Sequence, residues 1–187
     1  MKPENQLTTW LNDEARVREL AAAGPGAGVV TPEQALGLTG LQVLQAMLRG
    51  DISYATIART LDFCLIEVSD GSAIFQGAPG PAHLNPMGAV HGGWYATLLD
   101  SALGCSVHSK MPAGRGFTTA ELSVNLVKAL SPKVERVRAI GQVLHCGRQL
   151  ATAEARLVGP DGTLYAHGTT TCLVFDLPSK LNTPSKG

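Results

Sequence analysis

The sequence predicts an α+β fold in which a curved antiparallel sheet wraps one long helix. Two strand-like segments precede a long apolar segment, and four more follow it. Short turn motifs separate these strands, so we expect an antiparallel meander. The apolar segment has almost no polar face, and such a helix is stable only when other elements bury it on most sides.

Local patterns place each of these elements. The segment 61–71 alternates loosely and ends in Asp70-Gly71, a favourable hairpin turn from which SAIFQGA returns. Residues 94–110, WYATLLDSALGCSVHSK, are long enough and rich enough in Ala and Leu for a helix. The remaining strands are predicted at Phe117–Leu130, Val134–His145, Gln149–Val158 and Thr163–Phe175, with turns at Ser131-Pro132, Cys146-Gly147 and Pro160-Asp161-Gly162.

The main domain is predicted to cover residues 61–176. Residues 1–30 are predicted as a short polar helix and a Gly/Ala/Pro linker with little to pack, and residues 177–187 as a disordered tail. Residues 31–60 are predicted as a helical extension, with Thr31 as N-cap, Pro32 in the first turn and Gly50 ending a run of leucines. Two roles stay open for this extension: a cap over a substrate pocket, or a contact between subunits.

The composition excludes several classes of protein. Fifteen Lys and Arg balance fifteen Asp and Glu without a basic cluster, which argues against nucleic acid or a membrane surface as partner. The sequence has neither a secretory signal pattern nor an apolar run long enough for a membrane helix. The four cysteines lack CxxC spacing, so we expect free thiols in a reducing cytoplasm, no metal site and no cofactor; they are Cys64, Cys105, Cys146 and Cys172.

The start of the long helix carries the first sign of function. Gly92 and Gly93 stand at a place where glycine costs roughly 1 kcal/mol per residue against alanine in a helix interior. Glycine lets a ligand approach the backbone, and the first helical turn offers unpaired N–H groups and the positive end of the dipole. This combination indicates an oxyanion hole for a carbonyl oxygen that gains negative charge. A simple tight turn or hinge is the other interpretation.

Asp100 is the second sign, because it lies in the same helix among leucines and alanines. A carboxylate buried without partners destabilises a fold, and this helix has almost no polar face on which to expose one. We therefore expect Asp100 to act chemically, either as the general base for a water molecule or as a nucleophile on a carbonyl carbon.

The spacing of these two features predicts a dimer. Gly92 and Asp100 are eight residues apart, which corresponds to roughly 12 Å along one helix. A nucleophile and an oxyanion donor must both act on one carbonyl group, within about 3 Å of its atoms. Two helices packed antiparallel about a two-fold axis bring the start of one helix to the middle of the other. We therefore expect two identical sites per dimer, each built from both chains.

The pattern Asn85-(x)5-His91-Gly92-Gly93-(x)6-Asp100 resembles the signature of hot-dog thioesterases of the phenylacetate-degradation (PaaI) type, and residues 118–125 resemble that family's strand after the helix. The resemblance covers residues 61–175. It implies a hot-dog fold and a thioester hydrolase that releases coenzyme A from an acyl-CoA substrate without a metal. It also implies a homodimer, and a dimer of dimers.

The resemblance also implies roles for individual residues. Asp100 would be the catalytic carboxylate and Gly92 the oxyanion donor, with Gly93 beside it against the substrate. Asn85 and His91 would position the thioester. Thr119 would orient the water; Thr118 is the alternative, because alternation along a strand lets only one of the two face the site. The coenzyme A moiety is expected at the turn that contains His145, Gly147 and Arg148, where the arginine could pair with a phosphate.

Two alternative functions remain at this stage. Hot-dog enoyl-CoA hydratases resemble one another in an Asp/His pair about five residues apart, but here Asp100 is followed by Cys105, which disfavours hydration. A protein that binds acyl-CoA without hydrolysing it has no such contrary sign. The sequence does not choose between aryl and aliphatic acyl groups; Trp94 and Tyr95 could line an acyl pocket or belong to the core.

Overall fold

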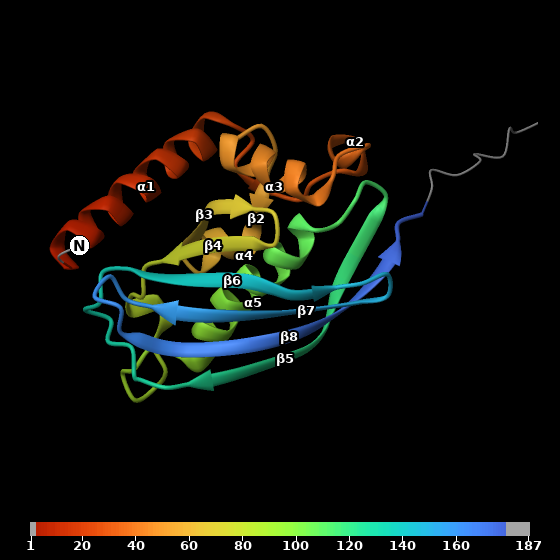
Figure 1. The fold of residues 1–187 in the computed structure, drawn as a ribbon. Helices are drawn as coiled ribbons and strands as arrows, with labels where there is room; N and C mark the ends of the chain where they lie inside the picture. Colours follow the sequence, from red (N-terminus) through yellow and green to blue (C-terminus); the bar gives the residue numbers. More distant parts are fainter. Residues whose placement is uncertain (1–2, 179–187) are drawn as a thin grey trace, which may run out of the picture.

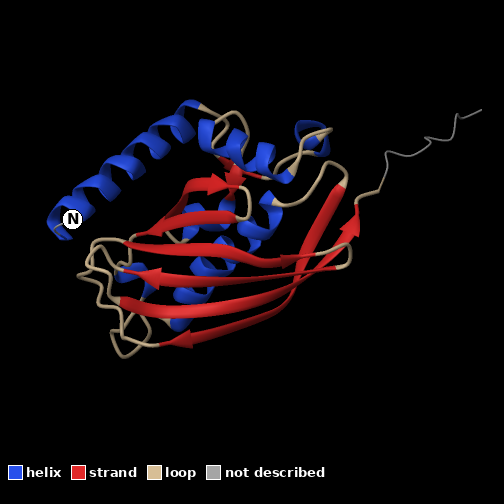
Figure 2. Ribbon diagram, viewed as in Figure 1, coloured by secondary structure: helices blue, strands red, loops and turns tan. Residues whose placement is uncertain are grey.

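The predicted fold class is confirmed by a computed structural model, which describes residues 3–178. Helix α5 (Gly92–Ser109) packs against one curved face of a six-stranded antiparallel sheet (Figure 1; Figure 2). The sheet has the order β3-β4-β6-β7-β8-β5 and consists of β3 (Phe63–Ser69), β4 (Ser72–Gly77), β5 (Arg115–Leu126), β6 (Val137–Cys146), β7 (Leu150–Val158) and β8 (Leu164–Asp176). The predicted disordered tail lies, from residue 179 on, outside the described residues.

Small side chains on the sheet let α5 lie close to it. The core side of β6 and β7 presents alanines that are completely buried, such as Ala139 and Ala153. Leu98, Leu99 and Leu103 of α5 are likewise fully buried against this surface. The helix begins at Gly92, two residues before its predicted start, and the predicted Asp70-Gly71 hairpin joins β3 to β4.

The prediction of a meander is right for β6, β7 and β8 and wrong for β5. Strand β5 pairs with β8 at the far edge of the sheet, while β6 pairs with β4. The connection between β5 and β6 is not a tight turn at Ser131-Pro132. It spans residues 127–136, and its Leu130 is buried and donates its backbone N–H to the hydroxyl oxygen of Tyr95 on α5. Because this segment packs against the first turns of α5, it can carry the chain from one edge of the sheet back to its middle.

The first 60 residues form more structure than the sequence predicted. Helix α1 (Pro3–Ala23) is long rather than short, and it buries Trp10 and Val17. The predicted cap at Thr31 starts only the short helix α2 (Pro32–Ala35), and a second capping box at Thr39 starts α3 (Gly40–Arg49). Helix α4 (Thr56–Thr60) follows, and the short strands β1 (Ala27–Gly28) and β2 (Tyr54–Ala55) pair in parallel. The predicted short helix is therefore a long one that packs on the core, and the predicted linker contributes Ala27–Gly28 to a strand pair.

A buried polar network attaches α1 to the sheet. Glu14 is 5% exposed, and its carboxylate accepts hydrogen bonds from Arg18, Gln76 and Arg136. Arg138 donates to the side-chain oxygen of Gln76, and its guanidinium lies 4.6 Å from the ring centre of Trp10. Burial raises the pKa of the Glu14 carboxyl, but its hydrogen-bond donors outweigh that effect and hold the pKa below its usual value. Since the donors come from α1, β4 and the residue just before β6, the network fixes the extension in place.

We predict that Glu14→Ala lowers the free energy of unfolding by about 3 kcal/mol at pH 7, because the donors lose their buried acceptor. Urea unfolding measures this difference, and Glu19→Ala, at an exposed position of the same helix, is the control. A carboxyl group with a lowered folded-state pKa stabilises the fold above its unfolded pKa, and the effect fades as pH falls. The difference between Glu14→Ala and wild type should therefore narrow below pH 4.5, and a constant difference would contradict the assignment.

Candidate active site

The glycine turn forms the first turn of α5, as its sequence predicted. His91 is the N-cap residue, and its Nδ1 accepts a hydrogen bond of 2.9 Å from the backbone N–H of Gly93. An acceptor at Nδ1 places the proton of the neutral imidazole on Nε2. Because the His91 side chain is exposed, this Nε2–H can donate to a group outside the helix.

The backbone N–H of Gly92 has no hydrogen-bond partner within residues 3–178. As the first residue of the helix, it is one of the donors that the helix itself cannot satisfy. A Cβ atom at position 92 would lie 3.1 Å from Cδ1 of Leu126, which is the end of an exposed, flexible side chain. The described chain thus offers two donors at the start of α5, one from the Gly92 backbone and one from His91.

Asn85 shapes the loop that leads into the helix. Its Oδ1 accepts hydrogen bonds from the backbone N–H groups of Met87 and Ala89, at 2.9 and 3.2 Å. A bridge between Leu84 and Val90 closes the base of this loop. The Asn85 side-chain oxygen is therefore occupied inside the loop, and only its amide N–H groups remain as donors for a ligand.

Asp100 lies half-buried at the middle of α5, facing strand β5. Its Oδ1 accepts a hydrogen bond of 3.3 Å from the hydroxyl group of Thr119. Burial raises the pKa of the Asp100 carboxyl, and the hydrogen bond from Thr119 offsets only part of that rise. A carboxylate with a raised pKa and few hydrogen bonds is a stronger base than a fully solvated one, which suits proton abstraction near neutral pH.

The two candidate threonines of β5 are separated by the geometry of the strand. Thr119 faces Asp100, and Thr118, the next residue along the strand, is exposed and points to the opposite face. Cys172, opposite Thr119 on β8, is fully buried, and burial raises the pKa of its thiol. The sequence marked Cys172 only as a free thiol; its place opposite Thr119 was missed because the pairing of β5 with β8 was not predicted.

Within one chain, the donors and the carboxylate do not meet. Gly92 and Asp100 lie in the same helix, eight residues or roughly 12 Å apart. Strand β5, which carries Thr119, is an edge strand of the sheet, and most of its side chains are exposed. Long exposed edges are ready-made pairing surfaces for another chain.

The turn expected to bind coenzyme A lies between β6 and β7, beyond the start of β5. Arg148 is exposed, and its backbone oxygen accepts a hydrogen bond from Arg115, the first residue of β5. Arg115 and Thr119 are four residues apart, so the turn lies roughly 13 Å along the strand from the carboxylate. Gly147 belongs to the same turn, where its N–H donates to the backbone oxygen of Leu150, whereas His145 lies near the end of β6.

Three aromatic side chains near the site support it from within the core. Trp94 is buried and donates its indole N–H to the oxygen of Leu61, and Tyr95 is buried against the 127–136 connection. The sequence left both residues open as pocket or core, and the structure places them in the core. His83 belongs to no motif, and its ring stacks on Trp94. The backbone oxygen of His83 accepts a hydrogen bond from the backbone N–H of His91. It thereby holds the N-cap residue in position.

No group of three or more His, Cys, Asp or Glu side chains within residues 3–178 is arranged to hold a metal ion. In the same part of the chain, no helix is long and apolar enough to cross a membrane.

Comparison with known families and structures shows what this chain is similar to. Residues 87–166, which contain α5 and Asp100, match the family model of the thioesterase superfamily. No curated protein matches the sequence significantly. The fold is that of hot-dog thioesterases, and the predicted resemblance to the phenylacetate-degradation (PaaI) branch is confirmed.

Individual structures illustrate this likeness. A phenylacetic acid degradation-related protein from Ralstonia eutropha is 26% identical, with a TM-score of 0.63 over 70% of this chain and 98% of that one. The PaaI protein of Thermus thermophilus, solved as a mutant, is 24% identical, with a TM-score of 0.56 over 63% and 96%. A hypothetical thioesterase from Streptococcus pneumoniae, solved with coenzyme A, is 24% identical, with a TM-score of 0.58 over 65% and 94%. About a third of this chain thus lies outside each alignment.

We predict that Thr119→Val raises the pKa of the Asp100 carboxyl further, because it removes the hydrogen bond that favours the ionised form. Carbon-13 NMR titration of labelled aspartate measures the pKa directly, without any assumption about activity. Thr118→Val is the matched control and should leave the titration unchanged. The same response from both variants, or from neither, would contradict the facing of Thr119 toward Asp100.

Proposed function

We propose that this protein is an acyl-CoA thioesterase, which hydrolyses the thioester to the free acid and coenzyme A without a metal. The observation that carries the proposal is the half-buried Asp100 carboxylate of α5, which accepts a hydrogen bond from the Thr119 hydroxyl of β5. The first N–H group of the same helix is unpaired within the described residues. A protein of the same fold has been solved with coenzyme A. In this chain, the Arg148 guanidinium would pair with the phosphate groups of coenzyme A.

The donors at the start of α5 fit the carbonyl oxygen of a thioester. The Gly92 N–H and the Nε2–H of His91 would stabilise the negative charge that this oxygen gains as the carbonyl carbon becomes tetrahedral. The free amide N–H groups of Asn85 lie on the same loop and would hold the acyl group in place. A hole of this kind typically contributes a factor of about 10² to 10³ in rate per donor.

Asp100 would supply the oxygen nucleophile opposite this hole. As a general base, it takes a proton from water while the water oxygen bonds to the carbonyl carbon; the thiol then leaves with that proton. As a nucleophile, it bonds to the carbonyl carbon and the C–S bond breaks; the coenzyme A thiolate leaves and takes up a proton, and water hydrolyses the resulting mixed anhydride in a second step. In either route, Thr119 orients the carboxylate or the water. Oxygen-18 from labelled water incorporated into Asp100 during a single turnover would identify the nucleophilic route.

The working unit in this proposal is a dimer. The exposed edge strand β5 of one chain would lie beside that of a second, so that the Gly92 N–H and His91 of one chain face Asp100 and Thr119 of the other. This arrangement removes the 12 Å separation within one helix, and the dimers could pair further. The protein would act in the reducing cytoplasm, where its four free cysteines stay reduced.

We predict that Asp100→Asn lowers kcat for acyl-CoA hydrolysis at least 100-fold, because it removes the base or nucleophile while keeping the shape of the side chain. The release of free thiol across a panel of acyl- and aryl-CoA substrates measures this loss. Asp70→Asn, at an exposed surface ion pair with Lys110, is the control and should retain full activity.

Two results would overturn the proposal. Asp100→Asn could retain wild-type turnover, or the wild type could bind acyl-CoA without releasing thiol from any member of the panel. The second result would establish an acyl-CoA-binding protein instead. Formation of 3-hydroxyacyl-CoA from an enoyl-CoA would establish a hydratase, although the residue at position 105 is a partly buried thiol whose pKa burial raises to about 12.

A further inference from the structure

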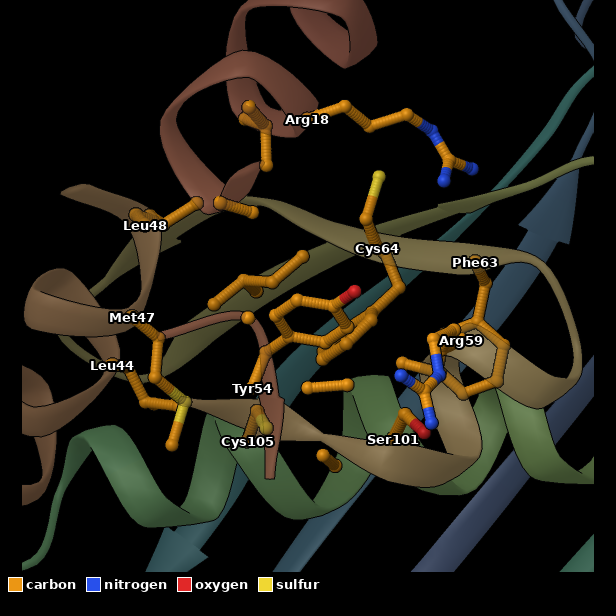
Figure 3. A pocket seen from close by; sticks show the side chains of 18 of the residues that line it. Arg18, Leu44, Met47, Leu48, Tyr54, Arg59, Phe63, Cys64, Ser101 and Cys105 are labelled. Carbon is orange, nitrogen blue, oxygen red and sulfur yellow. The ribbon is translucent and has the colours of Figure 1, made fainter. Parts of the chain in front are cut away.

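A large cavity lies between the first 60 residues and the hot-dog core. Its volume is about 480 Å³, within the range of roughly 300–1,000 Å³ that small-molecule sites occupy. Residues of helices α1, α3 and α4 and of strand β3, including Phe63, line the cavity, and α5 closes it at the bottom of the view in Figure 3. Two thirds of the residues that line the cavity precede residue 61.

The interior of this cavity is apolar and nearly free of charge. Aliphatic and aromatic side chains dominate the walls, among them Leu44, Met47 and Phe75, and none of the lining residues is acidic. Burial raises the pKa of the Cys64 and Cys105 thiols to about 12, so both are uncharged at neutral pH. Burial also lowers the pKa of His108, which favours its neutral form. An apolar ligand is the kind that such walls would stabilise.

Positive charge is confined to two arginines that also line the cavity. Arg18 pairs with Glu14 and Asp62, and its guanidinium lies at the end of an exposed side chain. Arg59 is exposed as well, and it lines the cavity together with Ser101 of α5 (Figure 3). A ligand with an apolar body and an anionic or polar end would match this distribution.

The cavity lies beside the candidate catalytic carboxylate. Ser101, Cys105 and His108 line it, and their spacing of four and three residues puts them on one stripe of α5. Asp100 is the residue next to Ser101 and occupies the adjacent stripe, facing Thr119. Asp100 does not itself line the cavity; it borders the wall that Ser101 forms, because consecutive helical residues project about 100° apart.

We propose that this cavity holds the hydrocarbon chain of the acyl group, so that the preferred substrates are thioesters of medium- and long-chain aliphatic acids; this rests on the proposed thioesterase function. A single aryl ring would leave most of a 480 Å³ space unfilled, whereas a flexible chain can fill it. The thioester carbonyl would lie at Asp100, and the chain would pass Ser101 into the cavity.

Two contacts make the extension a fixed wall rather than a loose cover. A Cβ atom on Gly40 would lie 1.8 Å from the backbone oxygen of His108, so glycine is what lets α3 touch the end of α5. The Gly40 N–H also donates to the oxygen of Met111, at 2.9 Å. The Glu14 network holds α1 at the other side. The cavity should accordingly keep its length and impose a limit on the acyl chain.

Filling the cavity from α1 tests this proposal. Ala21 is half-buried and lines the cavity, so Ala21→Phe should occupy part of it, and Ala22→Trp should do so from an exposed position. Ala15→Phe, at an exposed position of α1 that does not line the cavity, is the matched control. Two measurements are made on each full-length protein: calorimetric binding of dodecanoic acid, and kcat/KM for acetyl-, octanoyl-, dodecanoyl- and phenylacetyl-CoA.

In the wild type, we expect kcat/KM to rise about two- to fourfold per added methylene until the cavity is full, since burying one methylene is worth up to about 0.8 kcal/mol. Either cavity variant should weaken dodecanoic acid binding and lower kcat/KM for dodecanoyl-CoA at least tenfold. The values for acetyl- and phenylacetyl-CoA should change less than threefold, and Ala15→Phe should behave like the wild type throughout.

The outcomes separate this proposal from the function on which it rests. If Asp100→Asn abolishes hydrolysis but both cavity variants bind dodecanoic acid and hydrolyse dodecanoyl-CoA like the wild type, the cavity does not hold the acyl chain, and the thioesterase function stands. If phenylacetyl-CoA is the best substrate and loses as much as dodecanoyl-CoA in these variants, the aliphatic assignment is wrong. Because dodecanoic acid binding needs no turnover, it tests the cavity even if Asp100→Asn remains active.

Discussion

The structure depends on one conflict: a helix that must be buried carries a carboxylate at its middle. The sheet encloses α5 on its apolar sides, and Leu98, Leu99 and Leu103 are completely removed from solvent. Asp100 interrupts this surface, and the Thr119 hydroxyl is its hydrogen-bond partner from the facing strand. Burial without full compensation raises the pKa of this carboxyl, which destabilises its ionised form and makes it reactive as a base. The same feature thus costs stability and supports chemistry.

The elements around α5 divide the work of building a site. The loop at Asn85 and the cap at His91 present donors at the start of the helix, while β5 presents Thr119 at its middle. The β6–β7 turn lies farther along β5. The extension adds an apolar cavity on the neighbouring stripe of the helix, where Ser101 and Cys105 form its wall. The thioester carbonyl, the coenzyme A moiety and the acyl chain of the substrate would then each bind at a separate place around α5.

Much of this could be predicted from the sequence, and what could not has physical reasons. Periodicity and turn residues give the strands, and the apolar character of residues 94–110 gives the buried helix, because these signals are local. The pairing of β5 with β8 was missed because it depends on the 127–136 connection packing against Tyr95. The packing of α1 was missed because its contacts to Gln76 and Arg136 span more than 60 residues, and Glu14 looks like a surface residue in sequence. The cavity depends on this packing of α1, so no motif could mark it.

The most direct test of the two-chain site is complementation between inactive subunits. Gly92→Pro removes the N–H at the first helical position, where proline is well tolerated, and Gly92→Ala keeps that N–H as the control. Gly92→Pro and Asp100→Asn should each be nearly inactive alone, and Gly92→Ala should stay active. After the two inactive proteins are unfolded together and refolded in equal amounts, mixed dimers with one intact site should restore about a quarter of wild-type activity. Demonstrated mixed dimers without recovered activity would show that the two groups do not serve one site across the subunits.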